Sequence, residues 1–376
     1  MSSVTTATPA AKPVGVGIIG LSARGGWASV AHVPALAVLK DKFELRALST
    51  SSADSAQLAG EKYGVPLAFG SPEELVRRDE VDLVVVTVKV PHHRQLVNTA
   101  LQAGKHVLSE WPLGNGLAEA EEMAALATST GVRGFVGLQG RSLPTMRYLR
   151  DLIADGYVGQ VLSTSVVASG VEWGATMSTG AEYLLDRNNG ATMLTIPFGH
   201  TIDILSMVLG EFTEISATTA VRRPRVTLET GQSATMTAED QIAVVGRLEG
   251  GAVASVHFRG GISPITPFHW EINGTEGDIV VTASSGHLQF SPAVLRGARS
   301  TDAQLTELPV PAEYENVTGL SDGPVHSVGH AYATLHKDLT NGTHIAPDFQ
   351  LALRRHRLLD SIERSAATGQ RIHIAE

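Results

Sequence analysis

The sequence contains no cysteine among its 376 residues, so disulfide bonds, thiolate catalysis and cysteine-ligated metal sites are excluded. It also has no run rich in Lys or Arg, and its formal net charge is −9, which argues against a basic face that binds nucleic acid. Its longest apolar run, residues 81–88, is interrupted by Asp82 and is too short to cross a bilayer. We therefore expect neither a nucleic-acid partner nor a membrane partner.

The first 13 residues are small and polar and lack the apolar core of a signal peptide. They are expected to form a disordered arm on a cytoplasmic protein. The remaining length, in a chain with 43 % hydrophobic residues, is enough for more than one hydrophobic core. We therefore expect two domains, at residues 14–140 and 141–376.

Residues 14–49 combine a short apolar strand, a glycine-rich turn, a helical stretch and a second strand. The turn runs Gly20-Leu-Ser-Ala-Arg-Gly25 and matches the dinucleotide fingerprint G-x-G-x-x-G, except that its second glycine is Ser22. Such a unit presents free backbone N–H groups and the positive end of a helix to a pyrophosphate. An ordinary strand-to-helix turn is the alternative, but the repeated strand and helix units that follow favour a nicotinamide dinucleotide. The residues expected to contact it here are Gly20, Ser22, Ala23, Arg24, Gly25, Gly26, Trp27, Ser49 and Thr50.

The second strand ends without the acidic residue that usually accepts a hydrogen bond from a ribose 2′-hydroxyl. Residues 49–52 are Ser-Thr-Ser-Ser, so no carboxylate is available there to repel a 2′-phosphate. Arg24, in the preceding turn, would suit such a phosphate. The expected cofactor is therefore NADP or NAD, with NADP at least as acceptable.

Strands and helices alternate as far as residue 140, which predicts a doubly wound parallel sheet, a Rossmann domain. The expected strands in this part are residues 82–88, 105–109 and 132–138, and the expected helices are residues 94–103 and 117–130. After a helix at residues 144–154, expected strands follow at residues 161–169, 213–221, 241–248, 253–259, 269–273 and 278–282. They predict an open, mostly antiparallel sheet with helices on one face, at residues 191–209, 330–339 and 348–367. The predicted fold class is α/β followed by α+β.

The open sheet expected in the second domain indicates that the protein forms oligomers. A sheet face that its own helices leave uncovered normally finds cover in a partner subunit, so a homodimer or homotetramer is expected. Residues 292–327 are rich in Pro, Gly and Ser and are expected to form a long surface excursion. The second domain is thus expected to serve substrate binding and oligomerisation.

Several strings in matching order carry a family resemblance. The string Ala103-Gly-Lys-His-Val-Leu-Ser-Glu-Trp-Pro112 and the string Gly199-His-Thr-Ile-Asp203 resemble the Gfo/Idh/MocA oxidoreductases. The strings Leu138-Gln-Gly-Arg141, Tyr183-x-x-Asp186-x-x-Asn189 and Phe198-Gly-His-Thr-Ile-Asp-Ile-Leu205 resemble the branch of that family that contains the fungal galactose-pathway repressor. The resemblance implies a nicotinamide in an interdomain cleft, hydride transfer to or from a carbohydrate- or polyol-like substrate, and dimerisation through a sheet face.

The resemblance also implies roles for individual residues. The implied catalytic residues are His200, as general acid or base, Tyr183 and Asp186. The implied substrate-binding residues are Trp111, Arg141 and Asn189, and the implied additional cofactor-binding residues are His93, Glu110, Trp111 and Pro112. Sugar-oxidising members usually have a lysine where this chain has Trp111, and an aspartate where it has Ile196. These two departures leave a second interpretation open, a regulatory protein that binds the dinucleotide without catalysis.

Each of these roles has a structural alternative. His200 lies among apolar residues and would suit a hydrophobic core, and Trp111 would suit either packing beneath the cofactor or stacking on a nicotinamide or sugar ring. Arg141 would either anchor substrate or hold a loop by pairing with a carboxylate. The segment of residues 183–190 would also suit a purely structural turn. His92 and His93 are adjacent, but no third ligand stands at a suggestive spacing from them, so no bound metal is expected.

The missing acid at the end of the second strand generates a prediction on cofactor choice. We expect NADP(H) to bind no more than about tenfold more weakly than NAD(H), a difference of about 1.4 kcal/mol. Calorimetric titration of the protein with both nucleotides measures this ratio. A strong selectivity for NAD(H) would contradict the prediction.

Overall fold

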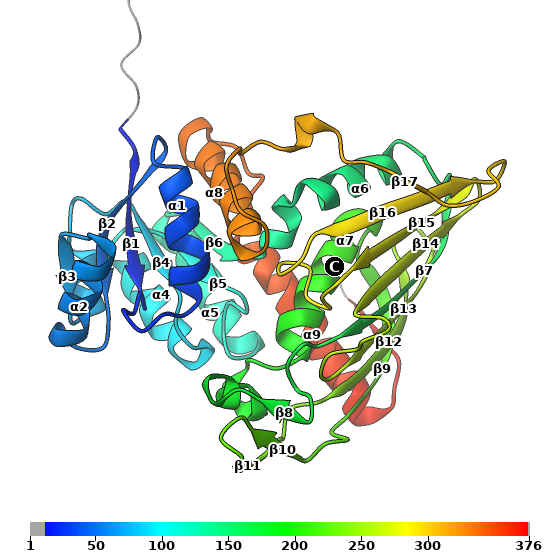
Figure 1. The fold of residues 1–376 in the computed structure, drawn as a ribbon, viewed down its shortest axis with the longest axis horizontal. Helices are drawn as coiled ribbons and strands as arrows, with labels where there is room; N and C mark the ends of the chain where they lie inside the picture. Colours follow the sequence, from blue (N-terminus) through cyan, green and yellow to red (C-terminus); the bar gives the residue numbers. More distant parts are fainter. Residues whose placement is uncertain (1–11, 375–376) are drawn as a thin grey trace, which may run out of the picture.

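The computed structural model describes residues 12–374, so most of the expected N-terminal arm lies outside the described residues. The first sheet is parallel and has the strand order β3-β2-β1-β4-β5-β6 (Figure 1). Its strands are β1 (Val14–Ile19), β2 (Phe43–Ser49), β3 (Leu67–Phe69), β4 (Leu83–Val86), β5 (His106–Glu110) and β6 (Gly134–Gly137). This is the order of a dinucleotide-binding doubly wound sheet, so the fold prediction for this part is confirmed.

The helices of the first part begin and end where short polar residues and glycines allow. They are η1 (Ala28–His32), α1 (Val33–Val38), α2 (Ala53–Tyr63), α3 (Pro72–Val76), η2 (Val90–His92), α4 (His93–Gln102) and α5 (Leu117–Thr130). The side chain of Ser52 caps α2, and Gly64 ends it in the left-handed conformation. The four residues of β4 are all buried, which explains the unbroken apolar run in the sequence.

The second large sheet has the strand order β17-β16-β15-β14-β7-β13-β12-β9-β18. Its strands are β7 (Val161–Ser169), β9 (Phe212–Ala220), β12 (Gln241–Leu248), β13 (Val253–Arg259), β14 (Phe268–Gly274), β15 (Gly277–Ala283), β16 (Ala293–Arg299), β17 (Thr306–Glu307) and β18 (Ile372–His373). Neighbouring strands are antiparallel except for β7 and β13, which pair in parallel. The prediction of an open, mostly antiparallel sheet is therefore confirmed.

The structure corrects several element boundaries. Residues 292–327 are not only a surface excursion, because β16 and β17 extend the sheet and η7 (Ala312–Tyr314) follows them. The helix expected at residues 330–339 is longer: α8 runs from Pro324 to Asn341, and its proline stands in the first turn, where no N–H is needed. The helix expected at residues 191–209 divides at Pro197 into η6 (Leu194–Phe198) and α7 (Gly199–Leu209).

Short elements without a clear pattern were not predicted. They are the small sheet of β8 (Thr176–Met177), β10 (Arg225–Leu228) and β11 (Ser233–Thr235), together with η3 (Gln139–Ser142), η4 (Thr179–Leu185) and η5 (Arg187–Asn189). Strands of two to four residues are too short for a period-2 pattern to identify them.

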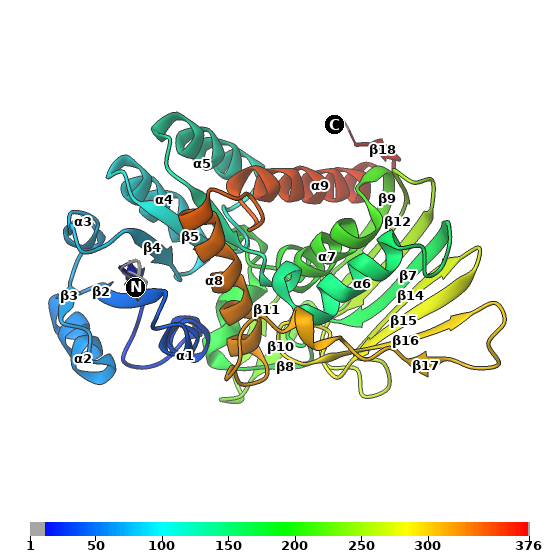
Figure 2. The ribbon, with the colours of Figure 1, turned by 90° about the horizontal axis from the view of Figure 1, so that it is seen from above.

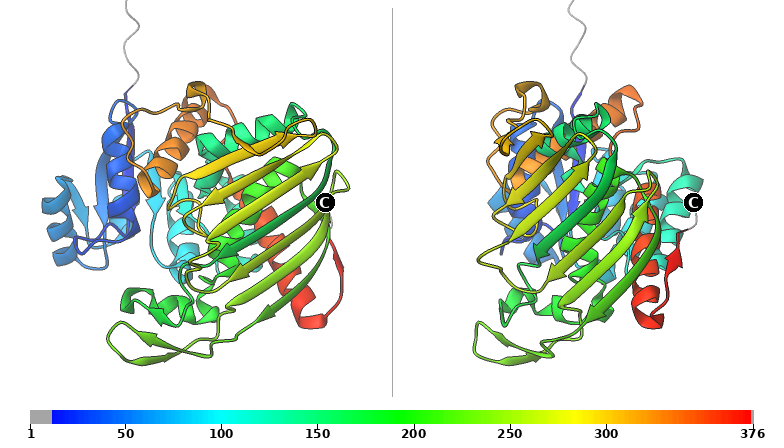
Figure 3. Two further views of the ribbon diagram at one scale, coloured as in Figure 1. Left: turned by 45° about the vertical axis from the view of Figure 1, so that its right-hand side comes forward. Right: turned by 90° about the vertical axis from the view of Figure 1, so that its right-hand side faces the viewer.

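Helices cover one face of the nine-stranded sheet. These are α6 (Pro144–Ala154), α7 and α9 (Phe349–Thr368), and Figure 2 shows them on the side of the sheet that faces the first domain. The opposite face carries no helix among residues 12–374 (Figure 3). Helix α8 returns to the first domain and packs against α1 and η1. Among the described residues, no helix is both long and apolar enough to cross a membrane.

Gly20, just after β1, is a position where only glycine fits. Its φ of 99° is in the region that side chains avoid, and an added Cβ would lie 2.8 Å from the Val88 side chain. The turn after β1 therefore packs directly against the end of β4. This contact places the glycine-rich turn at the carboxyl edge of the parallel sheet, where doubly wound folds bind their ligands.

Candidate functional site

A cleft of about 510 Å³ lies between the carboxyl edge of the parallel sheet and the second domain. The first domain lines it with Trp27, Thr87, Val88, Val90, His93, Glu110 and Trp111. The second domain contributes Gly170, Val171, Glu172, Trp173, Tyr183, Leu184, Ile196, Pro197, His200, Ser285, His287, Gln289 and Phe290. Its size and its mixture of aromatic walls with a few polar groups are typical of a small-molecule site.

The glycine-rich turn leads into this cleft and has the features of a dinucleotide cradle. Gly25 and Gly26 have φ values of 104° and 121°, and a Cβ on Gly26 would meet no atom within 4 Å. The helix that begins at Ala28 follows directly, and the N–H groups of Ser29 and Val30 in its first turn donate to the Gly26 carbonyl at 3.1 and 3.2 Å. Exposed glycine backbone beside a helix start fits a pyrophosphate. The Lys62 ammonium and the Tyr63 hydroxyl, both on α2, hold the turn by donating to its carbonyls.

The end of β2 lies beside this turn. Ser49 is buried, and its hydroxyl has no hydrogen-bond partner among the described residues. Thr50 donates to the Ser52 carbonyl and contacts the Ser55 hydroxyl. The Arg24 side chain is exposed, and its backbone N–H donates to the Ser22 hydroxyl at 3.1 Å. The turn and the strand end are thus neutral or positive, as the sequence indicates.

Glu110, at the end of β5, is held in a hydrogen-bond network. His32 Nε2 lies 3.0 Å from Glu110 Oε1, and Gln139 Nε2 donates to the same carboxylate at 3.0 Å. His32 Nδ1 lies 2.9 Å from the Tyr332 hydroxyl. Because a carboxylate only accepts hydrogen bonds, His32 donates from Nε2 to Glu110. Glu110, which lines the cleft, is therefore connected to α8 by hydrogen bonds through His32 and Tyr332.

Trp111 forms a wall of the cleft and is 5 % exposed. Its indole N–H donates to the Thr195 carbonyl at 2.6 Å, and its ring packs on His356 with ring centres 4.9 Å apart. An added Cβ at Gly199 would lie 2.9 Å from Trp111 Nε1, so α7 needs glycine there to approach the indole. Of the two interpretations of Trp111, packing is the one that these contacts favour.

His93 and Pro112 meet beneath the same wall. His93 Nδ1 lies 3.0 Å from the Pro112 carbonyl oxygen, and His93 Nε2 lies 3.0 Å from that of Val88. Burial lowers the pKa of His93. The side chain thus ties the ends of β4 and β5 together at the floor of the cleft.

His200 is the second residue of α7 and lies in the cleft, as the resemblance implies. Gln289 Nε2 lies 2.7 Å from His200 Nδ1, and the His287 ring is 5.0 Å away between centres. Burial lowers the pKa of His200 to about 3 and that of His287 well below its usual value. Both imidazoles are therefore neutral at physiological pH.

Glu172 is a further titratable group in the cleft, and the sequence did not single it out. Burial raises the pKa of its carboxyl, and no hydrogen bond to another described residue opposes this shift. Burial also raises the pKa of the Tyr183 hydroxyl, with a smaller contribution from the negative charge of Glu172, so the two groups are near one another. Together they provide a carboxyl and a phenol whose pKa values are both raised by burial.

The backbone around Glu172 is strained. Val171 and Trp173 have φ values of 70° and 61°, which β-branched and bulky residues rarely adopt. The indole N–H of Trp173 donates to the Leu184 carbonyl at 3.0 Å, and the Gly261 N–H donates to the Glu172 carbonyl at 2.7 Å. Strained residues that the surroundings hold in place are concentrated at functional sites.

The resemblance assigns roles to three residues that do not line the cleft: Arg141, Asp186 and Asn189. Arg141 makes a two-pronged ion pair with Asp203, at 2.7 and 2.8 Å, which is the structural alternative considered for it. Asp186 and Asn189 line a separate groove, where Asp186 caps η5 and the Asn189 amide donates to the Tyr183 carbonyl. Tyr183 lines both the groove and the cleft.

Sequence reasoning missed Glu172, His287 and Gln289. Glu172 follows the end of β7, and the other two lie in the loop between β15 and β16. A signal existed for Glu172, since a polar residue directly after a predicted strand commonly faces a ligand at a sheet edge. The loop of residues 284–292 has no such signal.

Comparisons with known proteins agree with this geometry. Residues 14–138 match the family described as "Oxidoreductase family, NAD-binding Rossmann fold", and residues 144–283 match "Gal80p, C-terminal domain". The chain is 30 % identical to dehydrogenase aclE of Aspergillus oryzae, over 96 % of this chain and 98 % of that protein. It is 27 % identical to the galactose/lactose metabolism regulatory protein GAL80 of Saccharomyces cerevisiae, over 100 % and 97 %. The crystal structure of a super-repressor mutant of Gal80p from Saccharomyces cerevisiae superposes with a TM-score of 0.88, at 25 % identity, over 96 % of this chain and 98 % of that one.

The Arg141–Asp203 pair generates a prediction. Asp203 is buried, so Arg141→Ala leaves its carboxylate with a weaker set of partners and should lower the free energy of unfolding by about 3 kcal/mol. Denaturant unfolding measures this loss. Because Arg141 lies outside the cleft, nucleotide affinity measured by calorimetry should stay unchanged. The exposed pair of Arg94 and Glu122 provides the control, since Arg94→Ala should cost less than about 1 kcal/mol.

Proposed function

We propose that this chain, which belongs to the Gfo/Idh/MocA oxidoreductase family and carries a C-terminal domain of the Gal80p type, is an NAD(P)-dependent oxidoreductase. Its substrate would be a carbohydrate- or polyol-like alcohol or the corresponding ketone. Bound dinucleotide would supply hydride chemistry at its nicotinamide ring. The residues that would hold it are those of the turn at positions 20–27 and the end of β2, with Arg24 placed to favour NADP.

The observation that carries this proposal is the composition of the cleft. Aromatic rings of Trp27, Trp173 and Phe290 line it and would contact the C–H faces of a cyclic substrate. Glu172 and Tyr183 stand among them and would exchange hydrogen bonds with hydroxyl groups. Such a pocket excludes bulk water and still orients a polyol, as hydride transfer requires.

Proton transfer must accompany the movement of a hydride between an alcohol and a ketone. We assign the role of general acid or base to Glu172, because its raised pKa lies closer to the working pH than that of an ordinary glutamate. His200, with a pKa of about 3, is a weak base in this site. Gln289 donates to His200 Nδ1, so the neutral ring would instead donate a hydrogen bond from Nε2 to a substrate oxygen. The raised pKa of Glu172 and the low pKa of His200 support Glu172 as the general acid or base, in place of the His200 that the family resemblance implies.

A second candidate function is a regulatory protein that binds a dinucleotide without turnover. The observation that favours it is Trp111, which fills the position of the usual family lysine and is fully occupied by packing contacts. The likeness to GAL80, whose name describes a regulator, points the same way. The aclE relative, whose name describes a dehydrogenase, points to the enzyme.

The enzyme proposal is tested by turnover. Purified protein is incubated with NAD(P)⁺ and a panel of sugars, inositols and other cyclic polyols, and reduced nicotinamide is followed by absorbance. With an active substrate, Glu172→Gln should lower kcat by about 10² to 10⁴-fold and leave nucleotide affinity unchanged. The wild-type rate of alcohol oxidation should rise as the pH passes the raised pKa of Glu172. This pH dependence should be absent in the Glu172→Gln variant.

Two controls accompany this test. Glu182→Gln changes an exposed carboxylate next to Tyr183 and should leave kcat unchanged. A carboxyl whose pKa is raised in the folded state destabilises the fold once it ionises, so its contribution to stability falls as pH rises. Glu172→Gln should therefore not lower Tm at neutral pH. If His200→Ala loses activity and Glu172→Gln does not, the assignment is wrong. If nucleotide binds and no substrate in the panel turns over, the regulatory function is favoured.

We also propose that the uncovered face of the nine-stranded sheet joins two copies of the chain. Val245 and Val253, on β12 and β13, are about half exposed, and their registers place both on this face. Light scattering after size exclusion should show a dimer or tetramer, and Val245→Arg with Val253→Arg should yield monomers. Leu58→Arg, which changes a residue of similar exposure on α2, should leave the assembly intact. A monomeric wild type would overturn the proposal.

A further inference from the structure

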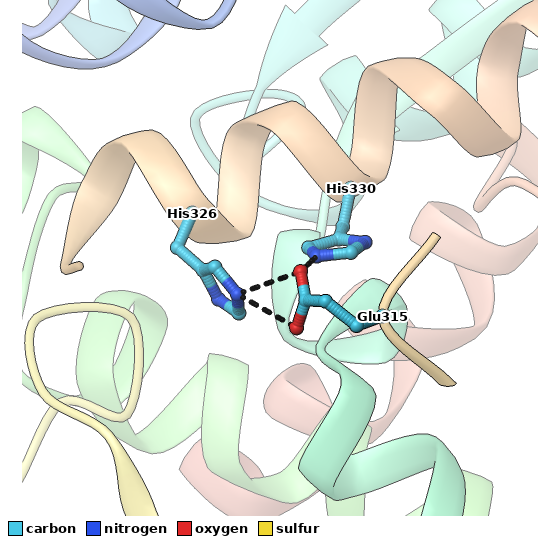
Figure 4. Close-up of side chains that lie close together, drawn as sticks. All are labelled: Glu315, His326 and His330. Carbon is cyan, nitrogen blue, oxygen red and sulfur yellow. Dashed lines mark hydrogen bonds and ion pairs between the residues drawn. The ribbon is translucent and has the colours of Figure 1, made fainter. Parts of the chain in front are cut away.

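Two histidines and a glutamate converge on one point at the start of α8, and none of the three lines the cleft. His326 and His330 are four residues apart on this helix and so share one of its faces. Figure 4 shows both rings turned toward the carboxylate of Glu315, which arrives from the segment before α8. The Nε2 atom of His330 lies 2.6 Å from Glu315 Oε1, and that of His326 lies 3.3 Å from the same carboxylate. These atoms all lie within 4.8 Å of one another.

We propose that Glu315, His326 and His330 form a binding site for a divalent transition-metal ion, with zinc as the best match. Two imidazole nitrogens and a carboxylate oxygen are a ligand set that zinc prefers, with water in the fourth position. Tetrahedral bonds of about 2.0 to 2.1 Å place ligand atoms roughly 3.3 Å apart, which is the distance between His326 and Glu315. A small rotation of Glu315 away from His330 would bring the His330–Glu315 distance, now 2.6 Å, to a similar value.

The three side chains are held in place before any metal binds. Tyr314, next to Glu315, donates to Asp151 Oδ2 on α6 at 2.8 Å, and its carbonyl accepts from Arg147 at 3.3 Å. The segment that carries Glu315 is therefore docked independently of α8. His330 is 2 % exposed, and its backbone position is set by the helix. Pre-positioned ligands reduce the entropy lost when a metal binds.

The site is also accessible to a cation. The side chains of His326 and Glu315 are 25 % and 40 % exposed, which leaves a path for the metal and room for a water ligand. Arg147 adds positive charge near His330, and the Glu315 carboxylate offsets it. The earlier expectation of no metal rested on His92 and His93, which belong to a different part of the chain.

A metal here would pin the segment of residues 308–323 to α8. This helix carries Tyr332, two residues beyond His330, whose hydroxyl begins the relay through His32 to Glu110 in the cleft. Gly323, at the helix start, lies near the carbonyl of Phe290, a residue of the cleft wall. The site would thus stabilise the side of the cleft that α8 supports, and it does not depend on whether the cleft is catalytic.

The proposal is tested with full-length protein that carries no histidine tag and has been treated with a chelator. Titration with zinc against a chromophoric indicator should give one equivalent per chain, and cobalt(II) should show the visible absorption of a tetrahedral site. His326→Ala and Glu315→Gln change partly exposed residues, so both should fold. Each should weaken zinc binding by at least about tenfold.

His344→Ala is the matched control, because it removes an exposed histidine beyond the end of α8. It should leave the stoichiometry and affinity unchanged. The absence of a stoichiometric zinc site in the wild type would overturn the proposal. So would equal affinities in the wild type and the His326→Ala variant, or an equal loss in His344→Ala.

Discussion

A buried ion network around Asp203 holds the centre of the molecule together. Asp203 lies on α7, one turn after His200, and accepts from Arg141 of η3 and pairs with Arg355 of α9 at 3.2 Å. Arg355 is itself 1 % exposed, donates to the Ser206 hydroxyl at 3.0 Å and pairs with Glu211. Burial of such charges is tolerated only when each is paired, so three helical segments must keep their relative positions. The helix that carries His200 is one of these segments.

The opposite wall of the cleft depends on a different kind of constraint. Val171 and Trp173 adopt backbone conformations that cost about 1 to 3 kcal/mol each, and the structure keeps them because their neighbours leave no alternative. Gly260 allows the Trp173 backbone to approach closely, and Gly261 binds the carbonyl of Glu172. The strain places a carboxylate in a poorly solvated position. A purely structural loop gains nothing from such an arrangement, whereas a site that handles protons does.

Helix α8 contacts the first domain both by packing and by hydrogen bonds. Its Tyr332 is fully buried and bonds to His32, which in turn bonds to Glu110 at the carboxyl end of β5. Because hydrogen bonds link Tyr332, His32 and Glu110 in series, a shift of α8 would alter the position of Glu110. The histidine and glutamate cluster at the helix start lies at the other end of this connection. A distant ligand and the cleft therefore share one rigid element.

The sequence by itself determined the parts of the protein that depend on local patterns. The glycine-rich turn needs backbone freedom that glycine has and other residues lack. The buried strand β4 needs an unbroken apolar run, so both features can be recognised from the sequence. The alternation of strands and helices likewise predicted the doubly wound sheet and its neighbour. Family strings pointed to His200 and Trp111, and both line the cleft.

Only the tertiary structure decided which polar groups meet. Glu172 and Gln289 follow strands that are separated by more than 100 residues, and Arg141 finds its carboxylate 62 residues away. Glu315 reaches the histidines of α8 because its segment docks on α6. Such contacts depend on how elements pack and on where buried charges find partners, and no periodicity along the chain encodes those distances.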